Sequence, residues 1–286
     1  MILAVMSDIH SNHIALKACI SQIEKIGVDG IIFLGDYVSD CPKPKETLQL
    51  INELKKSYQC YFIRGNREEY FLDYRVGIMK NWNYTSYKGS LLYTYEHLDD
   101  EVLDWFESLP NHMILEIKDT APIMLAHGSI HSARELLDEN KENTNSCLQE
   151  IKTQYMLCGH THRQCTYFYK GKTLINPGSV GVAIGVSKQA HFSTLEWKNE
   201  KWDVVHHQVP YDFETLKQCF FESKLMEKGK VWPMAILKSL ETGINYGPLC
   251  AKRAYDLAIA SDETISGRIV PEKYWITAAK EYGIIV

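Results

Sequence analysis

Short hydrophobic runs alternate with helical patterns along the first 66 residues. Residues 2–6, 31–34 and 61–63 are continuous apolar runs bounded by polar residues or glycine, which is typical of buried strands. Between these runs, hydrophobic residues recur at helical spacing over residues 14–26 and 44–56. This β-α-β-α-β order predicts parallel strands joined by right-handed helical crossovers.

The pattern becomes less regular in the middle of the chain. Residues 68–109 have the character of helices and loops, and residues 113–117 and 122–126 are predicted to pair as strands around a turn. Residues 155–158 form another short apolar run. Between this run and residue 209, turn residues separate short strand patterns, so we expect a second, largely antiparallel sheet there.

A change of pattern near Pro210 divides the chain into two parts. Residues 212–286 show helical spacing of hydrophobic residues and no convincing strand. We therefore expect one domain over residues 1–209 and a helical C-terminal extension over residues 210–286. The sequence pattern does not indicate the role of this extension.

Composition narrows the class of protein. The 286 residues are 45% hydrophobic with a net charge of −5, which gives no electrostatic reason to expect non-specific nucleic-acid binding. The eight cysteines are scattered without a C-x-x-C pair, a pattern that favours reduced thiols and a cytoplasmic location. No apolar run reaches the length of a membrane span, so no membrane association is expected.

Polar side chains that can bind metal ions follow several of the predicted strands. Ligands of open α/β sheets bind at the carboxyl ends of strands, so these side chains are expected to converge. All are oxygen or imidazole donors, and this mixture suits manganese, iron or zinc in catalytic sites. They are Asp8, His10, Asp36, Asn66, His127, His160 and His162.

Seven side-chain donors are more than one ion needs if water and substrate must also bind to it. Two ions that share one carboxylate would use all seven donors. Asp36 is the natural bridge, because its strand comes between those that lead to Asp8 and Asn66. Two ions about 3.5–4 Å apart stabilise the attacking and leaving oxygens of a phosphoryl transfer and activate water. This chemistry favours hydrolysis of a phosphate ester or anhydride by a metal-bridging hydroxide.

The order of these blocks resembles the calcineurin-like metallophosphoesterase superfamily. The matching segments are Asp8-Ile9-His10, Gly35-Asp36, Gly65-Asn66-Arg67-Glu68, His127 and Gly159-His160-Thr161-His162. The segments 7–12 and 176–181 resemble a prokaryotic branch of small phosphodiesterases and diadenosine polyphosphate hydrolase-like proteins. The resemblance covers about residues 1–209.

The resemblance implies a four-layer αββα sandwich of two mixed β-sheets, with a two-metal site at the strand ends. It further implies that Asp8, His10 and His162 hold one ion, that Asn66, His127 and His160 hold the other, and that Asp36 bridges them. We expect manganese in both positions, with iron, zinc or nickel as alternatives. Catalytic roles are expected for Asp36, Asn66, Arg67 and His127.

Arg67 departs from the family pattern, in which many members have a histidine that is thought to protonate the leaving group. Arginine stays protonated in proteins, so it is a poor general acid but a good clamp for phosphate. This favours anhydrides, aryl esters or activated diesters, whose leaving groups need less help. The alternative is that Arg67 only pairs with Glu68, Glu69 or a helix end.

Substrate contacts are expected from Arg67, Asn66 and Asn12, although Asn12 could equally cap the helix that follows it. The partner is expected to be a small phosphorylated substrate, and the oligomeric state is open. Phosphomonoesterase activity is the alternative on the same site. In the protein-phosphatase branch of the family, an arginine soon after the Gly-Asp block binds phosphate. Protein phosphatase activity is less favoured here, because residues 37–45 contain no arginine. A non-catalytic scaffold of this fold, like the retromer subunit, is the remaining hypothesis.

Overall fold

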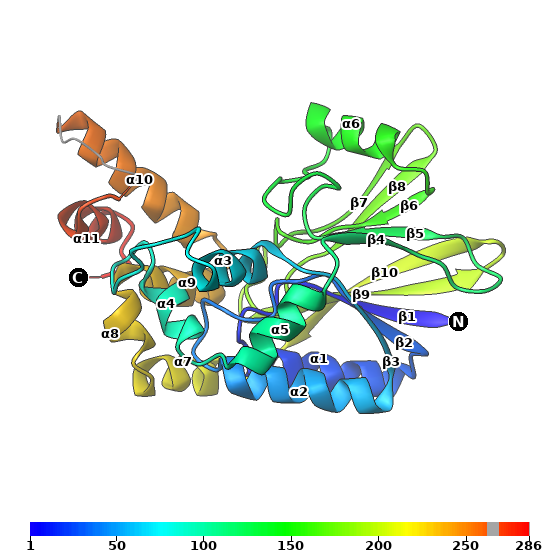
Figure 1. Ribbon diagram of the computed structural model, residues 1–286, viewed down its shortest axis with the longest axis horizontal. Coiled ribbons are helices and arrows are strands. Elements are labelled where there is room, and N and C mark those ends of the chain that lie inside the picture. The colour runs from blue at the N-terminus through cyan, green and yellow to red at the C-terminus, as the bar shows by residue number, and fades with distance from the viewer. Residues whose placement is uncertain (262–268, 286) are drawn as a thin grey trace.

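The computed structural model describes residues 1–261 and 269–285. It contains two five-stranded sheets that face each other (Figure 1). The first sheet has the strand order β10 (Lys201–Pro210), β9 (Gln189–Lys198), β1 (Ile2–Met6), β2 (Gly30–Phe33) and β3 (Gln59–Phe62). The second has the order β4 (His112–Leu115), β5 (Ile123–Ala126), β6 (Tyr155–Leu157), β8 (Lys172–Pro177) and β7 (Gln164–Tyr169).

Helices cover the outer face of each sheet. Six helices precede residue 151, namely α1 (His13–Ile26), α2 (Pro44–Ser57), α3 (Asn66–Arg75), α4 (Gly89–Tyr95), α5 (Asp100–Ser108) and α6 (Glu142–Glu150). Helices α1 and α2 lie on the first sheet, and α6 lies on the second (Figure 1). The predicted αββα sandwich of two mixed sheets is therefore confirmed.

The alternation of side chains along β1 explains why it occupies an inner layer. Ala4 and Met6 face the core under α1 and α2, whereas Leu3 and Val5 face the core between the two sheets. Successive side chains of a strand point to opposite faces, so a strand buried on both faces is hydrophobic at every position. Strands β1, β2 and β3 pair in parallel, as the repeated β-α units predicted.

The prediction that the last strands form one second, largely antiparallel sheet was wrong, because these strands are divided between the two sheets. Strands β7 and β8 join the second sheet, whereas β9 pairs antiparallel with β1 and β10 pairs with β9. Hairpin signals identify neighbours along the chain but not the sheet edge that receives the hairpin. In β9, Phe192 and Leu195 belong to cores on opposite faces of the first sheet, so β9 is an interior strand.

The described part of the C-terminal extension is helical, as expected from its pattern, and residues 262–268 and 286 of the predicted extension lie outside the described residues. Its helices are α7 (Phe213–Glu222), α8 (Leu225–Gly229), α9 (Val231–Thr242), α10 (Tyr246–Ala260) and α11 (Glu272–Glu281). They gather at one end of the sandwich (Figure 1). Phe213, Leu216 and Ile236 share a buried cluster with Cys41 and Val182 of the sandwich, so a hydrophobic contact fixes the extension. None of the helices in the described ranges has the length and apolar character needed to cross a membrane.

Glycine is required where the loops after β2 and β3 meet. Gly35 has φ +91°, and a Cβ added there would overlap the backbone nitrogen of Gly65. Both the positive φ and the close approach exclude a side chain at this position. This contact brings the residue after Gly35 next to the start of α3.

Replacement of Gly35 by alanine should destabilise the fold strongly. We expect Gly35→Ala to lower the free energy of unfolding by about 3 kcal/mol or more, because the left-handed backbone and the overlap both add strain. Gly171→Ala is the matched control, since Gly171 also has positive φ but a Cβ there would meet nothing within 4 Å. The control should lose only about 1 kcal/mol in urea unfolding. Equal losses in the two variants would contradict the close-contact argument.

Candidate metal centre

The predicted metal ligands converge at the end of the sandwich that the extension covers. Asp8 and His10 follow β1, Asp36 follows β2, and Asn66 is the first residue of α3 beyond β3. In the second sheet, His127 follows β5, whereas His160 and His162 follow β6. Parallel strands place these carboxyl ends along one edge of each sheet, and the two edges face each other.

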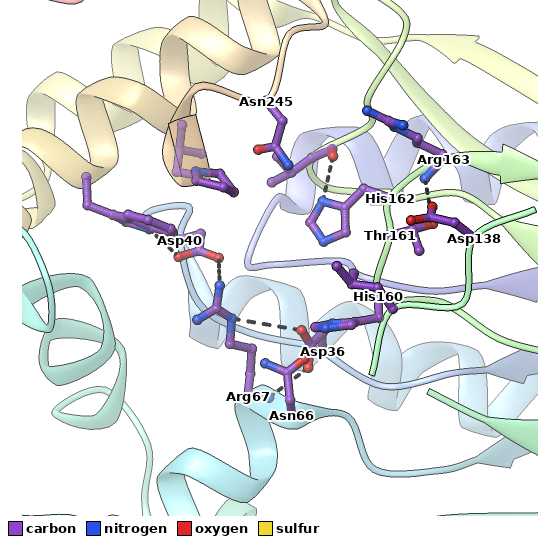
Figure 2. Close-up of a pocket in the computed structure, with 15 residues that line it drawn as sticks. Asp36, Asp40, Asn66, Arg67, Asp138, His160, Thr161, His162, Arg163 and Asn245 are labelled. Atoms are coloured by element: carbon purple, nitrogen blue, oxygen red, sulfur yellow. Dashed lines mark hydrogen bonds and ion pairs between the residues drawn. The ribbon is translucent and has the colours of Figure 1, made fainter. Parts of the chain in front are cut away.

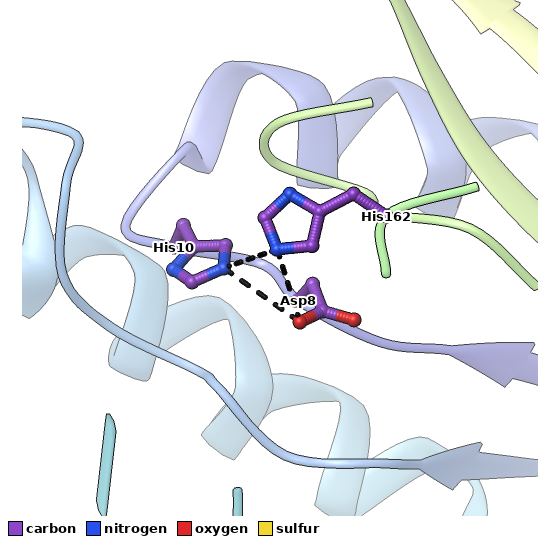
Figure 3. A group of neighbouring side chains, drawn as sticks. All are labelled: Asp8, His10 and His162. Carbon is purple, nitrogen blue, oxygen red and sulfur yellow. Dashed lines mark hydrogen bonds and ion pairs between the residues drawn. The ribbon is translucent and has the colours of Figure 1, made fainter. Parts of the chain in front are cut away.

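Asp8, His10 and His162 form the first group of donors (Figure 3). The Nε2 atoms of His10 and His162 are 3.0 Å apart, and Asp8 Oδ1 lies 3.7 Å from the first and 3.3 Å from the second. The Nδ1–H of His162 donates to the carbonyl oxygen of Val182 at 2.8 Å. This bond leaves Nε2 with a lone pair toward the group, which is the usual orientation of a metal-binding histidine.

Asp36, His127 and His160 form the second group. His127 donates from Nδ1 to the carbonyl oxygen of Leu34 at 2.7 Å, so its Nε2 faces the group. Asn66 Oδ1 lies 3.1 Å from His127 Nε2, which adds the amide oxygen of Asn66 to the donors.

Asp36 connects the two groups. Its Oδ2 lies 3.7 Å from Nε2 of His10 in the first group and 3.5 Å from Nε2 of His127 in the second. Asp8 Oδ1 also lies between the two groups, 3.7 Å from Nε2 of His10 and 3.8 Å from Nε2 of His127. This buried oxygen has no hydrogen-bond partner in the described structure. A buried carboxylate oxygen without a partner is costly unless a cation compensates it. The donor set and this orphaned oxygen therefore fit two divalent cations.

Backbone strain is concentrated at these donors. Positive φ angles between 49° and 65° occur at five of them: Asp8, His10, Asp36, His160 and His162. Residues other than glycine avoid this region, and such strain is found mainly at functional sites. The strain turns each side chain from its strand into the space between the two sheets.

Mutual electrostatic effects shift the pKa values of the site. Burial opposes the charged form of Asp8, yet His162 and His127 hold its pKa well below the ordinary value. Burial would likewise lower the pKa of His127, but the charges of Asp36 and Asp8 outweigh it and raise that pKa to about 10. Burial, followed by repulsion from His127, lowers the pKa of His160 to about 4. The carboxylates and imidazoles of the site thus set one another's protonation.

Two buried segments support the donor loops from behind. The carboxylate of Glu68 accepts hydrogen bonds from the backbone N–H groups of Asp36, Tyr37 and Gly65 at 2.8–2.9 Å. The 176–181 turn lies beneath Asp8, whose carbonyl oxygen accepts a bond from the hydroxyl of Ser179 at 2.7 Å. These contacts fix the loops independently of any bound ion.

Arg67 lies at the rim of the donors and lines a cavity of about 400 Å³ (Figure 2). Its Nη2 donates to Asp40 Oδ2 at 2.9 Å, and its Nε lies 3.9 Å from Asp36 Oδ2. Burial disfavours the charge of Arg67, but Asp40 and Asp36 raise its pKa above the ordinary value. The predicted alternative of a pair with Glu68 or Glu69 does not describe this side chain, whose ion-pair partners are Asp40 and Asp36.

Asn12 does not reach the site. It is fully buried, its Oδ1 accepts the N–H of Ala15 at 3.0 Å, and its Nδ2 donates to the carbonyl oxygen of Gly181 at 2.8 Å. Both ends of the side chain are occupied, so the predicted substrate contact of Asn12 does not fit this structure. The alternative, that Asn12 caps the first helix, is correct.

Several residues of the cavity do not follow from the sequence motifs. Asp40, Arg163, Trp232 and Asn245 line it together with Arg67. The sequence gives only a weak indication that Asp40 belongs to the site, since it is a second acidic residue in the loop after β2. The sequence gives no indication that Trp232 and Asn245 belong to the site, because both lie in the extension. Trp232 is 192 residues from Asp40, which it contacts.

Manganese binding to the metal-free protein should tighten as the pH rises from 6.5 toward about 10. His127 is protonated in this window because its pKa is raised from 6.5 to about 10, and a histidine must lose this proton to bind a metal ion. Binding therefore releases a proton, which changes the affinity by about tenfold per pH unit. Calorimetric titrations at several pH values measure this slope. His131→Gln, at an exposed histidine beside Glu150, is the control and should keep the slope. A pH-independent affinity would contradict the protonation of His127.

Comparisons with known proteins place these features in a family. A model of the calcineurin-like phosphoesterase superfamily domain matches residues 1–200. The uncharacterized protein MJ0912 of Methanocaldococcus jannaschii is 27% identical over 244 residues, which cover 79% of this chain and 94% of that protein.

Two crystal structures share the fold. The hypothetical protein PH1004 of Pyrococcus horikoshii has a TM-score of 0.70 at 20% identity, over 85% of this chain and 98% of the other. A metallophosphoesterase from Sphaerobacter thermophilus has a TM-score of 0.64 at 22% identity, over 85% of this chain and 99% of the other. The match of the family model, which spans more than half of the sequence, shows that the chain belongs to the calcineurin-like phosphoesterase superfamily.

Proposed function

We propose that the protein is a two-metal hydrolase that cleaves a phosphodiester or phosphoanhydride bond in a small substrate, including substrates of the nucleotide type. Metal-dependent phosphoester hydrolysis is the chemistry that the family indicates. The observation that carries the proposal is the position of Asp36 between two groups of donors, with the cation of Arg67 beside it. With two divalent ions held by the donors, this arrangement would place positive charge where a phosphate would bind.

In this proposal Asp8, His10 and His162 hold one manganese ion, Asn66, His127 and His160 hold the other, and Asp36 contacts both. Two divalent ions in such a site supply charge for the phosphoryl oxygens and an activated water at neutral pH. The protein contributes the strained loops, which hold the donors in place before any ion binds, so little reorganisation is needed. We further propose the cytoplasm as its location, which its eight free cysteines support.

Arg67 is proposed to bind the phosphate rather than to protonate the leaving group. Its raised pKa keeps the guanidinium charged, and its side chain is only 18% exposed, so the charge acts in a poorly solvated place. A reaction without a strong general acid favours good leaving groups, such as another phosphate or an aryl alcohol.

The shape of the cavity supports a small substrate. A volume of about 400 Å³ lies within the range of pockets that bury small ligands. Trp232, Ile236 and Pro248 of the extension supply apolar wall, and Asn245 supplies a polar group. A flat phosphorylated surface of a folded protein would not enter such a space, so protein phosphatase activity is less favoured. A phosphomonoesterase on the same site is the runner-up, and a scaffold without turnover is the alternative outside the enzymes.

Hydrolysis of a substrate panel tests the reaction class. With manganese, we expect bis-nitrophenyl phosphate or diadenosine polyphosphates to be cleaved faster than nitrophenyl phosphate or a phosphopeptide. Asp36→Asn should abolish turnover because it removes the negative charge shared by both groups, and Asn66→Ala should do so because it removes a donor of the second group. Asp119→Asn, the same change at an exposed turn, is the control. Much faster cleavage of the monoester would favour the phosphomonoesterase, and two bound metals without any turnover would favour the scaffold.

Arg67→Ala tests the phosphate contact. Loss of a charge-assisted hydrogen bond should raise KM roughly tenfold to a hundredfold for an aryl diester. The metal content should stay at two ions per chain, because Arg67 is not among the donors. Steady-state kinetics and metal analysis measure the two quantities. An unchanged KM would show that Arg67 is structural.

A further inference from the structure

The carboxylate of Asp40 joins the C-terminal extension to Arg67. Its Oδ1 accepts the indole N–H of Trp232 at 2.7 Å, and its Oδ2 accepts Nη2 of Arg67 at 2.9 Å. Asp40 is buried, so both contacts form away from bulk water. A buried carboxylate is stable only when its oxygens are paired, and here the two donors come from opposite parts of the fold.

Asp40 is also held from the side of the metal donors. Its Oδ2 lies 3.2 Å from Nδ1 of His10 and accepts the hydroxyl of Ser39 at 3.2 Å. The backbone at Asp40 has φ +62°, a conformation that a residue with a side chain adopts only under constraint. The orientation of this carboxylate is therefore set by all of its partners together, and Trp232 is the one that the extension contributes.

Trp232 is itself fixed before any substrate binds. It follows Val231, the first residue of α9, whose N–H donates to the hydroxyl of Ser86 at 3.1 Å. At the other end of α9, the N–H of Gly185 donates to the carbonyl oxygen of Gly243 at 2.9 Å. Contacts at both ends thus anchor α9 to the sandwich and present the indole to Asp40.

A purely structural role for Trp232 would leave Arg67 unaffected, yet Arg67 depends on the same carboxylate. Its buried Nε has no hydrogen-bond partner in the described structure and lies 3.9 Å from Asp36 Oδ2, so the shorter contact with Asp40 is the hydrogen bond that directs the guanidinium. A free arginine side chain loses rotamer entropy when it binds a ligand, and a preorganised contact removes this cost before the ligand arrives. Figure 2 shows the guanidinium between Asp40 and Asp36, at the edge of the cavity.

We propose that Trp232 is a positioning residue of the phosphate site: its indole N–H holds Asp40, and Asp40 holds the guanidinium of Arg67 beside Asp36. The extension therefore sets the affinity for phosphate as well as forming a wall of the cavity. This inference rests on the proposed function, because it takes Arg67 as the group that binds phosphate.

Binding of inorganic phosphate to the manganese-loaded full chain tests the proposal without turnover. Trp232→Phe keeps a ring but removes the N–H, and we expect it to weaken phosphate binding about tenfold in calorimetry. Trp82→Phe is the matched control, because the buried Nε1 of Trp82 has no hydrogen-bond partner in the described structure. Its ring packs against Phe71, Tyr74 and Tyr95. This control should stay within about twofold of the unaltered protein.

A double-mutant comparison makes the test specific. In an Arg67→Ala background, Trp232→Phe should cause no further loss of phosphate affinity, and the manganese content should be the same in all variants. If Trp232→Phe fails to fold, Trp232→Leu also removes the indole N–H and should weaken phosphate binding in its place.

The remaining results would overturn the proposal. Unchanged phosphate affinity in Trp232→Phe, or an equal loss in the Arg67→Ala background, would show that Trp232 does not act through Arg67. An unaltered protein that binds no phosphate would overturn both this inference and the phosphate site of the proposed function. Phosphate binding with the expected losses, but no hydrolysis of any substrate, would leave this inference standing and reject the hydrolase.

Discussion

The metal centre depends on close contact between backbones. The loop after β2 touches the loop after β3 at Gly35 and Gly65, and the loop after β6 meets the loop after β1 at Gly159, where a Cβ would overlap the side chain of Ser7. These contacts bring strand ends from two sheets within a few ångströms of one another. If any of these loops moved outward, carboxylate and imidazole donors would no longer share one ion.

The charges of the centre follow from this crowding. Asp8 and Asp36 are desolvated together, so each depends on neighbouring imidazoles for compensation. Glu68 is buried directly behind them, and burial together with the charge of Asp36 raises its pKa to about 7. The structure thus places three carboxyl groups close together, an arrangement that favours cations in the space between the sheets.

The sequence predicted those parts of the fold that leave a pattern among residues close together in the chain. Apolar runs located β1, β2 and β3, and polar residues directly after them located Asp8 and Asp36, because strand ends and ligands are adjacent in the chain. The position of β9 beside β1 was not predictable, since a hydrophobic strand carries no mark of its partner. The contact of Trp232 with Asp40 was equally hidden, because it joins segments 192 residues apart by tertiary packing alone. The sequence allowed two roles for Asn12, a substrate contact or a helix cap, and its burial in the structure decided between them.

The division of labour between the sandwich and α9–α10 has an evolutionary consequence. All seven candidate metal donors come from residues 8–162, whereas Trp232, Ile236, Asn245 and Pro248 on the cavity wall come from the extension. Substitutions in this short stretch can therefore alter which molecule is accepted without disturbing a single metal donor. Evolution can therefore reshape the cavity wall through the extension while residues 8–162 keep the candidate donors.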